Sequence, residues 1–554
     1  WEVFDRAEKT HLELEDDTEC IANCILIDDE PEITNEGSIY SYKFNDQNYK
    51  LKEGKTAFDA HQIKAVGTIL SIEENFPDKN VVEVFVSKRR KNVEMPSLLT
   101  LGNTTPPQVH QHDQALNKFL EDYILNDGKN YKSIMDMLER KCPDIKDIKS
   151  GSKLINEDEE LISQSTEIVK NLNNSYLTIQ GPPGTGKTYS SANIIIELMK
   201  AGKKVGVTSN SHEAIKTLLI AIEKQAVEQN FDFNGMRKAR SSDKYDWKFI
   251  QDITTGKPLN FSDYSLYAGT SWFFVDPRMN KSLDYLFIDE AGQVALGTTI
   301  ANATAAKNLV LIGDQMQLSQ PMRAKHEGYA KLSSLDFILE DNDTIPADKG
   351  VFLNITRRLN NKICNYISTS FYDSRLSPDP ITETRSVNLK LDPIKDEGLF
   401  YVPIEHSGCS QRSDEEADLV EKTYNKIIGK EFKSGKTKGK ISTKDIMVVA
   451  PYNAQANNIR ERLKKKFKND VRVGTIDLFQ GQEAKVVLIS MTTSDVESLP
   501  RHKDFFFSRN RLNVAISRAE CVAIIIFNEN LLLASANSIK EMKLMNSFCK
   551  LLKF

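Results

Sequence analysis

The clearest chemistry in the sequence lies in GPPGTGKT, residues 181–188. The segment follows a β-branched stretch at 176–180 and precedes an amphipathic stretch at 189–199, so we expect it to form a strand-to-helix turn. In such a turn backbone N–H groups wrap phosphates at a helix N-terminus, Lys187 meets the β and γ phosphates, and Thr188 holds magnesium. The phosphate loop comprises Gly181, Pro182, Pro183, Gly184, Thr185, Gly186, Lys187 and Thr188. The pattern predicts a nucleotide site.

A second acidic element narrows the reaction. A phosphate loop alone is compatible with kinases, GTPases, motor ATPases and transporters. The hydrophobic segment 283–288 ends in Asp289, which can hold magnesium, and Glu290, which can polarise an attacking water. A kinase does not need this glutamate, because its acceptor is a substrate hydroxyl rather than water. We therefore predict hydrolysis rather than phosphoryl transfer to a second substrate.

The segment LVLIGDQMQLSQP, residues 309–321, predicts a third buried strand that ends in a polar loop. Gln317 in this loop can sense the γ-phosphate of a bound nucleotide. Ser319 and Pro321, a few residues further on, are expected to face outward.

Strands that alternate with helices must position these residues. From about residue 151 to the end, short β-branched segments alternate with amphipathic ones, a pattern typical of parallel sheets covered by helices. Parallel α/β sheets bind ligands outside the carboxyl ends of their strands. Two series of strands, with a boundary near 345, predict two α/β domains in tandem, at 151–345 and 346–554. The expected strands are 176–180, 204–208, 285–289 and 309–313 in the first series, and 398–402, 445–449, 486–490 and 521–526 in the second.

The first 150 residues differ from the rest. Alternating segments between turns predict a small β-barrel at 31–104, and residues 105–150 are expected to be helical. In the second α/β domain, the basic stretch 433–440 is interpreted as a solvated connection.

Composition sets limits on partners and location. The chain has 554 residues, 40% hydrophobic and 27% charged, which is typical of packed globular domains. A net charge of -5 gives no overall basic field, so a nucleic-acid site must be a local groove. The seven cysteines are scattered without a CxxC pair, which suits reduced thiols in a cytoplasmic protein. The longest apolar run, 522–527, is too short to span a membrane.

Six segments, in this order, resemble the motifs of superfamily 1 helicases. They are GPPGTGKT, DEAGQ, GDQMQLSQP, TRRLNNKI, VGTIDLFQGQE and RLNVAISRA, within about residues 150–530. The resemblance is greatest to the 5′ to 3′ branch that holds senataxin and the nonsense-mediated-decay RNA helicase, and within it to bacterial proteins in which a RecB-like nuclease precedes the helicase. It implies an α/β fold with two tandem RecA-like P-loop domains and an N-terminal β-barrel and helical stalk insertion.

The resemblance also bears on the start of the chain. Residues 1–30 are expected to be the tail of an upstream nuclease domain that is missing from this sequence. No nuclease-type metal site can be assembled from residues 1–150, so we do not expect nuclease activity from this chain.

The resemblance assigns further nucleotide contacts. Gln164 matches the glutamine that reads the adenine edge, and Glu483 matches a glutamate that contacts the ribose. Arg358 matches an arginine finger, and Arg518 matches a second arginine on the γ-phosphate. Arg357 stands where the family has an aromatic residue that stacks on adenine; a guanidinium plane can also stack on a base, so its role stays open.

These assignments imply a split active site. The phosphate loop lies in the first expected α/β domain, whereas Arg358 and Arg518 lie in the second. ATP with Mg²⁺ is therefore expected to bind in the cleft between them. Binding would close the cleft and hydrolysis would reopen it, so each cycle can move a nucleic-acid strand.

By the same resemblance, a single strand of nucleic acid is held mainly through hydroxyl and amide contacts to its phosphates. The expected strand contacts are Ser209, Asn210, Thr270, Ser319, Pro321, Tyr452, Asn453 and Thr475.

The sequence thus predicts an ATP-dependent translocase that acts on single-stranded nucleic acid and unwinds duplexes with 5′ to 3′ polarity. DNA is favoured over RNA only through the likeness to nuclease fusions, so an RNA helicase stays an alternative. A module that closes on a nucleic acid or a protein without processive unwinding shares every ATP motif, and it stays open as well.

Overall fold

The structure is a computed structural model of residues 1–554, and it divides into two compact units. Unit 1 combines Trp1–Pro107 with Thr384–Phe554, and unit 2 is Gln108–Glu383. The structure describes residues 6–28, 30–74, 80–88, 95–102, 110–239, 243–254, 264–318, 327–435, 437–479, 481–494, 508–534 and 538–551.

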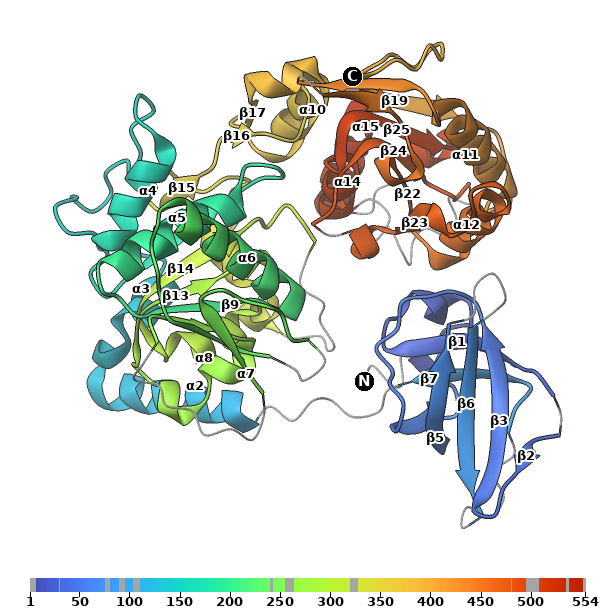
Figure 1. Ribbon diagram of the computed structural model, residues 1–554, viewed down its shortest axis with the longest axis horizontal. Coiled ribbons are helices and arrows are strands. Elements are labelled where there is room, and N and C mark those ends of the chain that lie inside the picture. Colours follow the sequence, from blue (N-terminus) through green and yellow to red (C-terminus); the bar gives the residue numbers. More distant parts are fainter. Residues whose placement is uncertain are drawn as a thin grey trace. The chain divides into compact units, whose positions relative to one another are not determined.

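The N-terminal part of unit 1 is an antiparallel sheet in the order β1-β7-β4-β5-β6-β3-β2. Because β1 pairs with both β7 and β3, the sheet closes into a barrel around an apolar core (Figure 1). The barrel includes β1, so it begins before the predicted boundary at residue 31. A 3₁₀ turn, η1 (Glu13–Asp16), precedes it. The strands are β1 (Cys20–Leu26), β2 (Glu32–Ile33), β3 (Gly37–Phe44), β4 (Thr56–Asp59), β5 (Lys64–Glu73), β6 (Asn80–Ser87) and β7 (Leu98–Gly102).

The C-terminal part of unit 1 contains a five-stranded parallel sheet in the order β19-β25-β24-β22-β23. Its strands are runs of apolar residues, as expected for strands with helices on both faces. The strands are β19 (Gly398–Pro403), β22 (Ile446–Ala450), β23 (Arg472–Thr475), β24 (Ala484–Ser490) and β25 (Ala519–Phe527). The helices are α11 (Asp414–Ile427), α12 (Asn453–Phe467), α14 (Arg509–Ile516) and α15 (Ile539–Lys550).

Unit 2 is built on an eight-stranded parallel sheet in the order β11-β10-β12-β9-β13-β14-β8-β15. Helices α5 and α6 cover one face and α7 and α8 the other, as right-handed crossovers in opposite directions require (Figure 1). The strands are β8 (Tyr176–Gln180), β9 (Val205–Thr208), β10 (Gly235–Lys238), β11 (Ile250–Ile253), β12 (Leu266–Ala268), β13 (Leu283–Ile288), β14 (Ala306–Gly313) and β15 (Gly350–Phe352). The helices of this part are α4 (Leu161–Lys170), α5 (Lys187–Lys200), α6 (His212–Glu228), α7 (Ser271–Phe274), α8 (Leu296–Ala303), α9 (Ser334–Leu339) and α10 (Asn361–Phe371).

The sheet of unit 2 continues past residue 345, where we expected the first α/β domain to end. Strand β15 pairs with β8, and the short strand β16 (Ile355–Thr356) and helix α10 follow it within the same unit. The α/β fold with two parallel sheets is confirmed.

The helical segment before this sheet also belongs to unit 2. Its helices are α2 (His110–Asn126) and α3 (Lys132–Leu138). Ala115 of α2 packs against Ala301 of α8, and the Tyr131 hydroxyl donates to Asn280 Oδ1 at 2.9 Å. The part of the chain that the structure describes contains no helix long and apolar enough to cross a membrane.

Candidate functional site

The segment 181–188 connects β8 to α5 as a tight turn around a lysine. Lys187 Nζ donates to the carbonyl oxygen of Gly181 at 2.6 Å, so the side chain folds back over the turn. A Cβ at Gly181 would lie 2.2 Å from Lys187 Cγ, and a Cβ at Gly184 would lie 2.4 Å from the Cβ of Arg358. Gly184 and Gly186 have φ values of 75° and 81°, which side chains disfavour. Only glycine fits these positions, and the turn exposes backbone N–H groups at the start of α5.

Asp289 and Glu290 follow β13 directly. Asp289 is buried, and its Oδ1 accepts a hydrogen bond from the Glu290 backbone N–H at 2.9 Å. Burial raises the pKa of the Asp289 carboxyl, and the charge of Glu290 raises it further, whereas Lys187 lowers it. Glu290 has a φ of 55°, a left-handed backbone that costs about 1–3 kcal/mol and is typical of functional sites.

The structure adds a carboxylate that we did not predict. Asp314 follows β14 and is buried; its Oδ2 accepts hydrogen bonds from the Tyr372 hydroxyl at 2.6 Å and from Gln317 Nε2 at 2.9 Å. Burial raises the pKa of Asp314, and Lys187 lowers it. The predicted γ-phosphate sensor Gln317 is thus positioned by Asp314. The sequence signal was present, because Asp314 follows a buried strand as Asp289 does.

Three neighbouring strand ends bring these residues together. In the sheet β13 pairs with β14 and β14 pairs with β8, so Asp289, Asp314 and the lysine-bearing turn lie side by side at one edge. A Cβ at Gly292 would lie 2.8 Å from the Asp314 carbonyl oxygen, which shows how closely the first two loops pack. One ammonium group therefore acts on two buried carboxylates. This arrangement suits a ligand that combines phosphate with a divalent cation.

The arginine pair lies against the phosphate loop within unit 2. Thr356 Oγ1 donates to the Pro183 carbonyl oxygen at 2.8 Å, and the backbone N–H of Arg357 donates to that of Gly184 at 2.8 Å. We expected Arg358 in a different domain from the phosphate loop, and this expectation is corrected. The physical reason is that β15 still pairs with β8, so the chain has not yet left the first sheet.

Arg357, the departure from the helicase pattern, is 57% exposed in its side chain, and its Nε lies 3.3 Å from Asp379 Oδ2. The carboxylate holds the guanidinium beside the phosphate loop, where a Cβ at Gly186 would lie 3.7 Å from Arg357 Nη1. Its contact with adenine stays a prediction.

Gln164 lies in the first turn of α4. Its Oε1 accepts from the backbone N–H of Asn156 at 2.7 Å, and its Nε2 donates to the carbonyl oxygen of Asn156 at 2.8 Å. The amide thus fastens the preceding loop to the helix. Reading an adenine edge would use the amide's second N–H or exchange one of these bonds, so the adenine role stays a prediction.

Three of the predicted strand contacts lie in unit 2. Ser209 is buried, and its Oγ has no hydrogen-bond partner among the described residues. Asn210 Nδ2 donates to the carbonyl oxygen of Gln293, next to the hydrolysis residues, and Thr270 stands at the start of α7. Ser319 and Pro321 lie outside the described residues.

In unit 1 the predicted strand contacts follow β22 and β23. Asn453 donates its backbone N–H to Asp16 Oδ1 at 2.8 Å and its Nδ2 to the Glu15 carbonyl oxygen at 2.7 Å. These bonds tie α12 to the turn η1, a structural role that we did not predict. Tyr452 and Thr475 are buried at the ends of the two strands.

Glu483 and Arg518 belong to unit 1 as well. Arg518 is buried and its Nη1 donates to the Gln482 carbonyl oxygen at 3.2 Å, whereas Glu483 is exposed. The guanidinium of Arg518 is thus fixed beneath the loop that carries Glu483. The structure places Arg358 and Arg518 in different units, which the sequence did not predict.

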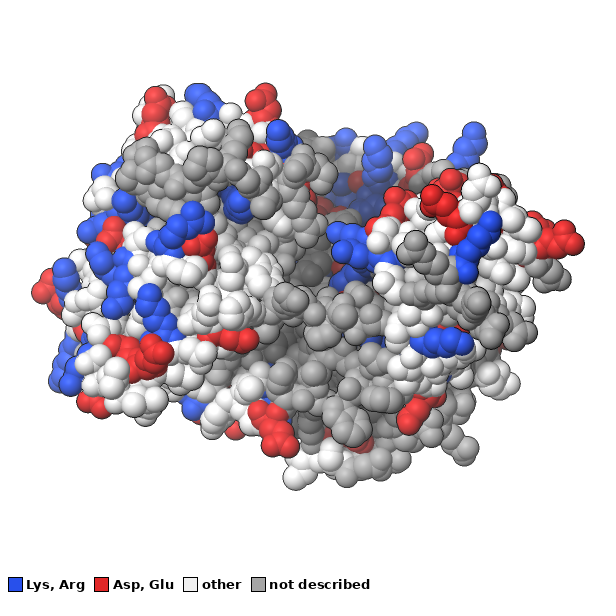
Figure 2. Space-filling view, turned by 90° about the horizontal axis from the view of Figure 1, so that it is seen from below, with Lys and Arg blue, Asp and Glu red and all other residues white. Residues whose placement is uncertain are grey.

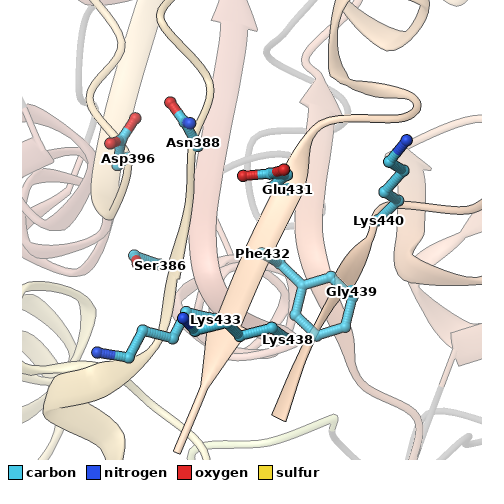
Figure 3. A pocket seen from close by; sticks show the side chains of 9 residues that line it. All are labelled: Ser386, Asn388, Asp396, Glu431, Phe432, Lys433, Lys438, Gly439 and Lys440. Carbon is cyan, nitrogen blue, oxygen red and sulfur yellow. The ribbon is translucent and has the colours of Figure 1, made fainter.

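The basic stretch 433–440, which we interpreted as a solvated connection, lies in a hairpin of β20 (Glu431–Ser434) and β21 (Thr437–Lys440), and its described lysines are exposed. Together with β18 (Ser386–Val387) it borders a hollow of about 560 Å³ (Figure 3). Lys433 and Lys438 lie opposite each other on the two strands. The hollow belongs to unit 1 and shares no residue with the phosphate loop.

Comparison with known proteins agrees with this geometry. Two family models, both described as AAA domains, match residues 163–326 and 333–530. The chain is 25% identical over 453 residues to the DNA polymerase alpha-associated DNA helicase A of Schizosaccharomyces pombe, covering 70% of this chain and 65% of the relative. It is 27% identical over 423 residues to the regulator of nonsense transcripts 1 homolog of Neurospora crassa, covering 67% and 37%.

Among solved structures, an Arterivirus nonstructural protein 10 (helicase) matches with a TM-score of 0.38 and 12% identity, covering 95% of this chain and 82% of that one. The chain spans less than two thirds of the length of the two relatives above. The motifs, the two AAA domains and these relatives agree, and the chain belongs to the superfamily 1 helicases.

Proposed function

We propose that this chain is an ATP-dependent helicase that moves along single-stranded nucleic acid. The observation that carries the proposal is the convergence of Lys187 with two buried carboxylates, Asp289 and Asp314, at the ends of adjacent strands. In this cluster the positive charge of Lys187 lies at the turn, and the carboxylates of Asp289 and Asp314 lie at the ends of the neighbouring strands. A nucleoside triphosphate with its cation matches both.

ATP and Mg²⁺ are the proposed ligands. The glycines allow the turn to lie directly against Lys187 and Arg358, because an added Cβ at Gly181 or Gly184 would collide with these residues. Thr188 and Asp289 would hold the magnesium ion, which neutralises charge on the phosphates when bound. Glu290 is proposed to take a proton from the attacking water, and Gln317 to contact the γ-phosphate.

The raised pKa of Asp289 supports the cation role. Burial disfavours the bare negative charge of this carboxylate, and a bound cation would offset that cost. Lys187 lowers the pKa of both carboxyls, and it is also the proposed partner of the phosphates.

Movement on nucleic acid is proposed from the family. The relative from Schizosaccharomyces pombe is described as a DNA helicase, and the one from Neurospora crassa as a regulator of nonsense transcripts, so DNA and RNA are both represented. Figure 2 shows acidic and basic side chains mixed over the described surface on one face. Polar contacts such as Ser209 and Asn210, rather than a basic field, are therefore the proposed basis of strand binding.

Four further properties stay proposals: DNA as the substrate, 5′ to 3′ polarity of this chain, a nuclease domain upstream and a cytoplasmic location. The first is favoured by the description of the Schizosaccharomyces pombe relative. The others rest on the sequence resemblance and composition alone.

ATPase activity of the purified chain, measured with single-stranded DNA and RNA side by side, tests the proposal. We expect stimulation by single strands and displacement of a strand from a duplex with a 5′ tail but not a 3′ tail. ATPase activity that no single strand stimulates would contradict the translocase function. Stimulation without strand displacement would instead support a binding or remodelling module.

A further inference from the structure

A second cluster of ligand-type side chains lies in unit 1, at the carboxyl end of its parallel sheet. His406 and Cys409 belong to the loop between β19 and α11, and Glu415 lies in the first turn of α11. One ring nitrogen, the thiol sulfur and a carboxylate oxygen of these residues lie within 4.8 Å of one another. None of the three belongs to the proposed hydrolysis site.

The imidazole of His406 has one nitrogen committed and one available. The side chain is 0% exposed, and its Nε2 lies 3.1 Å from Oε1 of Glu416, which is 0% exposed as well. A carboxylate accepts at this contact, so Nε2 carries the proton and Nδ1 keeps its lone pair. Nδ1 is buried and has no hydrogen-bond partner among the described residues. A buried acceptor without a partner costs about 1–3 kcal/mol, which a ligand would offset.

Glu416 is itself held firmly. Its Oε2 accepts from Ser490 Oγ at 2.5 Å and from the backbone N–H of Thr492 at 2.8 Å, both at the end of β24. The carboxylate therefore cannot turn away from His406. A histidine that donates one N–H to a fixed carboxylate is the usual arrangement behind a metal-ligating imidazole.

The other two side chains face each other. Cys409 Sγ lies 3.9 Å from Glu415 Oε2, which also accepts from Ser413 Oγ at 3.1 Å. The backbone of Cys409 is fixed by Ser494, which donates its N–H to the Cys409 carbonyl oxygen at 2.9 Å. The thiol and carboxylate thus come from two segments that other hydrogen bonds already hold in place.

We propose that His406 Nδ1, Cys409 Sγ and the Glu415 carboxylate bind a divalent transition-metal ion, with zinc the ion that this donor set favours. Ligand atoms around tetrahedral zinc lie roughly 3.3–3.8 Å apart, given Zn–N and Zn–S distances of about 2.0 and 2.3 Å. The cluster therefore needs to contract by about 1 Å. A water molecule would complete the coordination.

Such an ion would fasten the loop after β19 to the start of α11. It would also reach β24 through Glu416, since that carboxylate contacts both His406 and the Ser490–Thr492 segment. The ion would thus hold together the segments at the carboxyl edge of the sheet in unit 1. Magnesium does not compete for it, because magnesium prefers oxygen ligands to a thiolate.

Cobalt titration of the metal-free chain tests the proposal, with Mg²⁺ in excess to occupy sites made only of oxygen ligands. We expect one equivalent of Co²⁺ to produce a thiolate-to-cobalt charge-transfer band that Zn²⁺ removes. Cys409→Ser should abolish the band. The matched control is Cys142→Ser, because Cys142 is also partly exposed and lies 3.4 Å from a carboxylate, Asp348 Oδ2, but is not part of the cluster.

Two further variants separate a ligand from a merely structural residue. Glu415→Gln changes an exposed side chain, so it should fold normally yet bind Co²⁺ at least about 10-fold more weakly. Glu416→Gln should weaken Co²⁺ binding about 10–100-fold while the band still forms at saturating metal. Zinc should raise the Tm of the unaltered chain and leave that of Cys409→Ser unchanged. A band that persists in Cys409→Ser, or that is absent from the unaltered chain, would overturn the proposal.

Discussion

The two parallel sheets present polar residues at the same carboxyl edge, but they use them differently. In unit 2 burial raises the pKa of Asp289 and Asp314, and the ammonium of Lys187 lowers both. In unit 1 the buried Glu416 has both oxygens occupied, by His406 on one side and by Ser490 and Thr492 on the other. At the edge of unit 2 the buried carboxylates lie under the charge of a lysine, whereas at the edge of unit 1 the buried Glu416 is held by hydrogen bonds from neighbouring groups.

The turns at the two edges explain the difference. At Gly181 and Gly184 an added Cβ would collide with Lys187 and Arg358, so the glycines let both residues lie directly against the turn. The turn after β22 carries Tyr452 and Asn453 instead of glycines; both are buried, and the amide of Asn453 donates to η1. A shared topology provides the edge, and the glycines decide whether it can hold phosphate.

The largest expected effect concerns two arginines, one from each unit. Arg358→Ala and Arg518→Ala should each lower ATP turnover about 10³–10⁵-fold and leave ATP binding nearly intact, if these groups act on charge in the transition state as the helicase motifs imply. Alanine retains the Cβ of Arg358 that packs against Gly184. Phosphate release gives turnover, and a fluorescent ATP analogue gives Kd.

Two variants serve as references for that experiment. Arg278→Ala removes an exposed arginine paired with Asp276 in unit 2 and should leave turnover unchanged. Lys187→Ala should weaken both binding and turnover. Normal hydrolysis by Arg358→Ala would show that the assignment of this arginine is wrong.

Glu290 is the next test of the edge in unit 2. Glu290→Gln should lower kcat about 10²–10⁴-fold with ATP binding retained, because the amide cannot accept the proton of the attacking water. Glu197→Gln makes the same change at a partly exposed residue of α5 that pairs with Lys200, so it controls for loss of charge. If the two variants have equal activity, Glu290 takes no part in the reaction.

The pH dependence of stability tests the role of Asp16, which accepts a hydrogen bond from Asn453 at the carboxyl edge of the sheet in unit 1. Burial raises the pKa of this carboxyl to about 7, although the Asn453 N–H partly opposes the shift. Because the folded pKa lies above the unfolded value, stability should fall as pH rises from about 4 to 7 and then level off. Asp16→Asn should remove this slope and be more stable above pH 7, by up to about 4 kcal/mol for a shift of about three units.

Chemical denaturation of the two proteins across this pH range measures the effect. The difference between them should be smallest at the acid end of the range, because protonation of the unfolded carboxyl approaches that of the folded one only as pH falls through about 4. ATP turnover should stay unchanged, since Asp16 is not among the proposed hydrolysis residues. A stability difference that grows toward acid pH would contradict the raised pKa.

Tyr372 tests how Gln317 is positioned. Tyr372→Phe removes a hydrogen bond to the buried Asp314 carboxylate, worth about 1.5–3 kcal/mol, and should lower kcat about 10-fold with little change in KM. Tyr176→Phe removes a comparable bond, from the hydroxyl to the Lys141 carbonyl oxygen, elsewhere in unit 2. It should cost similar stability without affecting kcat. If both variants lose activity equally, the effect is one of stability alone.

The sequence predicted what lies close along the chain. The strand, the glycine turn and Lys187 are consecutive, and Asp289 and Glu290 follow a buried strand, so local patterns were enough to propose their chemistry. The barrel and the two parallel sheets followed from alternating and continuous apolar segments in the same way.

Residues that act through distant partners could not be predicted so easily. The roles of Asp314 and Tyr372 depend on a contact across 58 positions, and that of Asn453 on one across 438. Arg358 was expected in another domain because the pairing of β15 with β8 has no signal in the polar stretch around residue 345. His406 escaped notice for the same reason, since its carboxylate partner is recognisable only once the loop is folded.

The smallest expected effect concerns the hairpin of unit 1. Lys433 and Lys438 are direct cross-strand partners, and like charges in this position are unfavourable. Lys438→Glu should therefore raise the free energy of unfolding by about 0.2–1 kcal/mol, and added salt should reduce the gain. Lys422→Glu makes the same charge change at an exposed position of α11. If Lys422→Glu stabilises the protein as much as Lys438→Glu does, the gain reflects the change in net charge, and repulsion between Lys433 and Lys438 does not destabilise the hairpin.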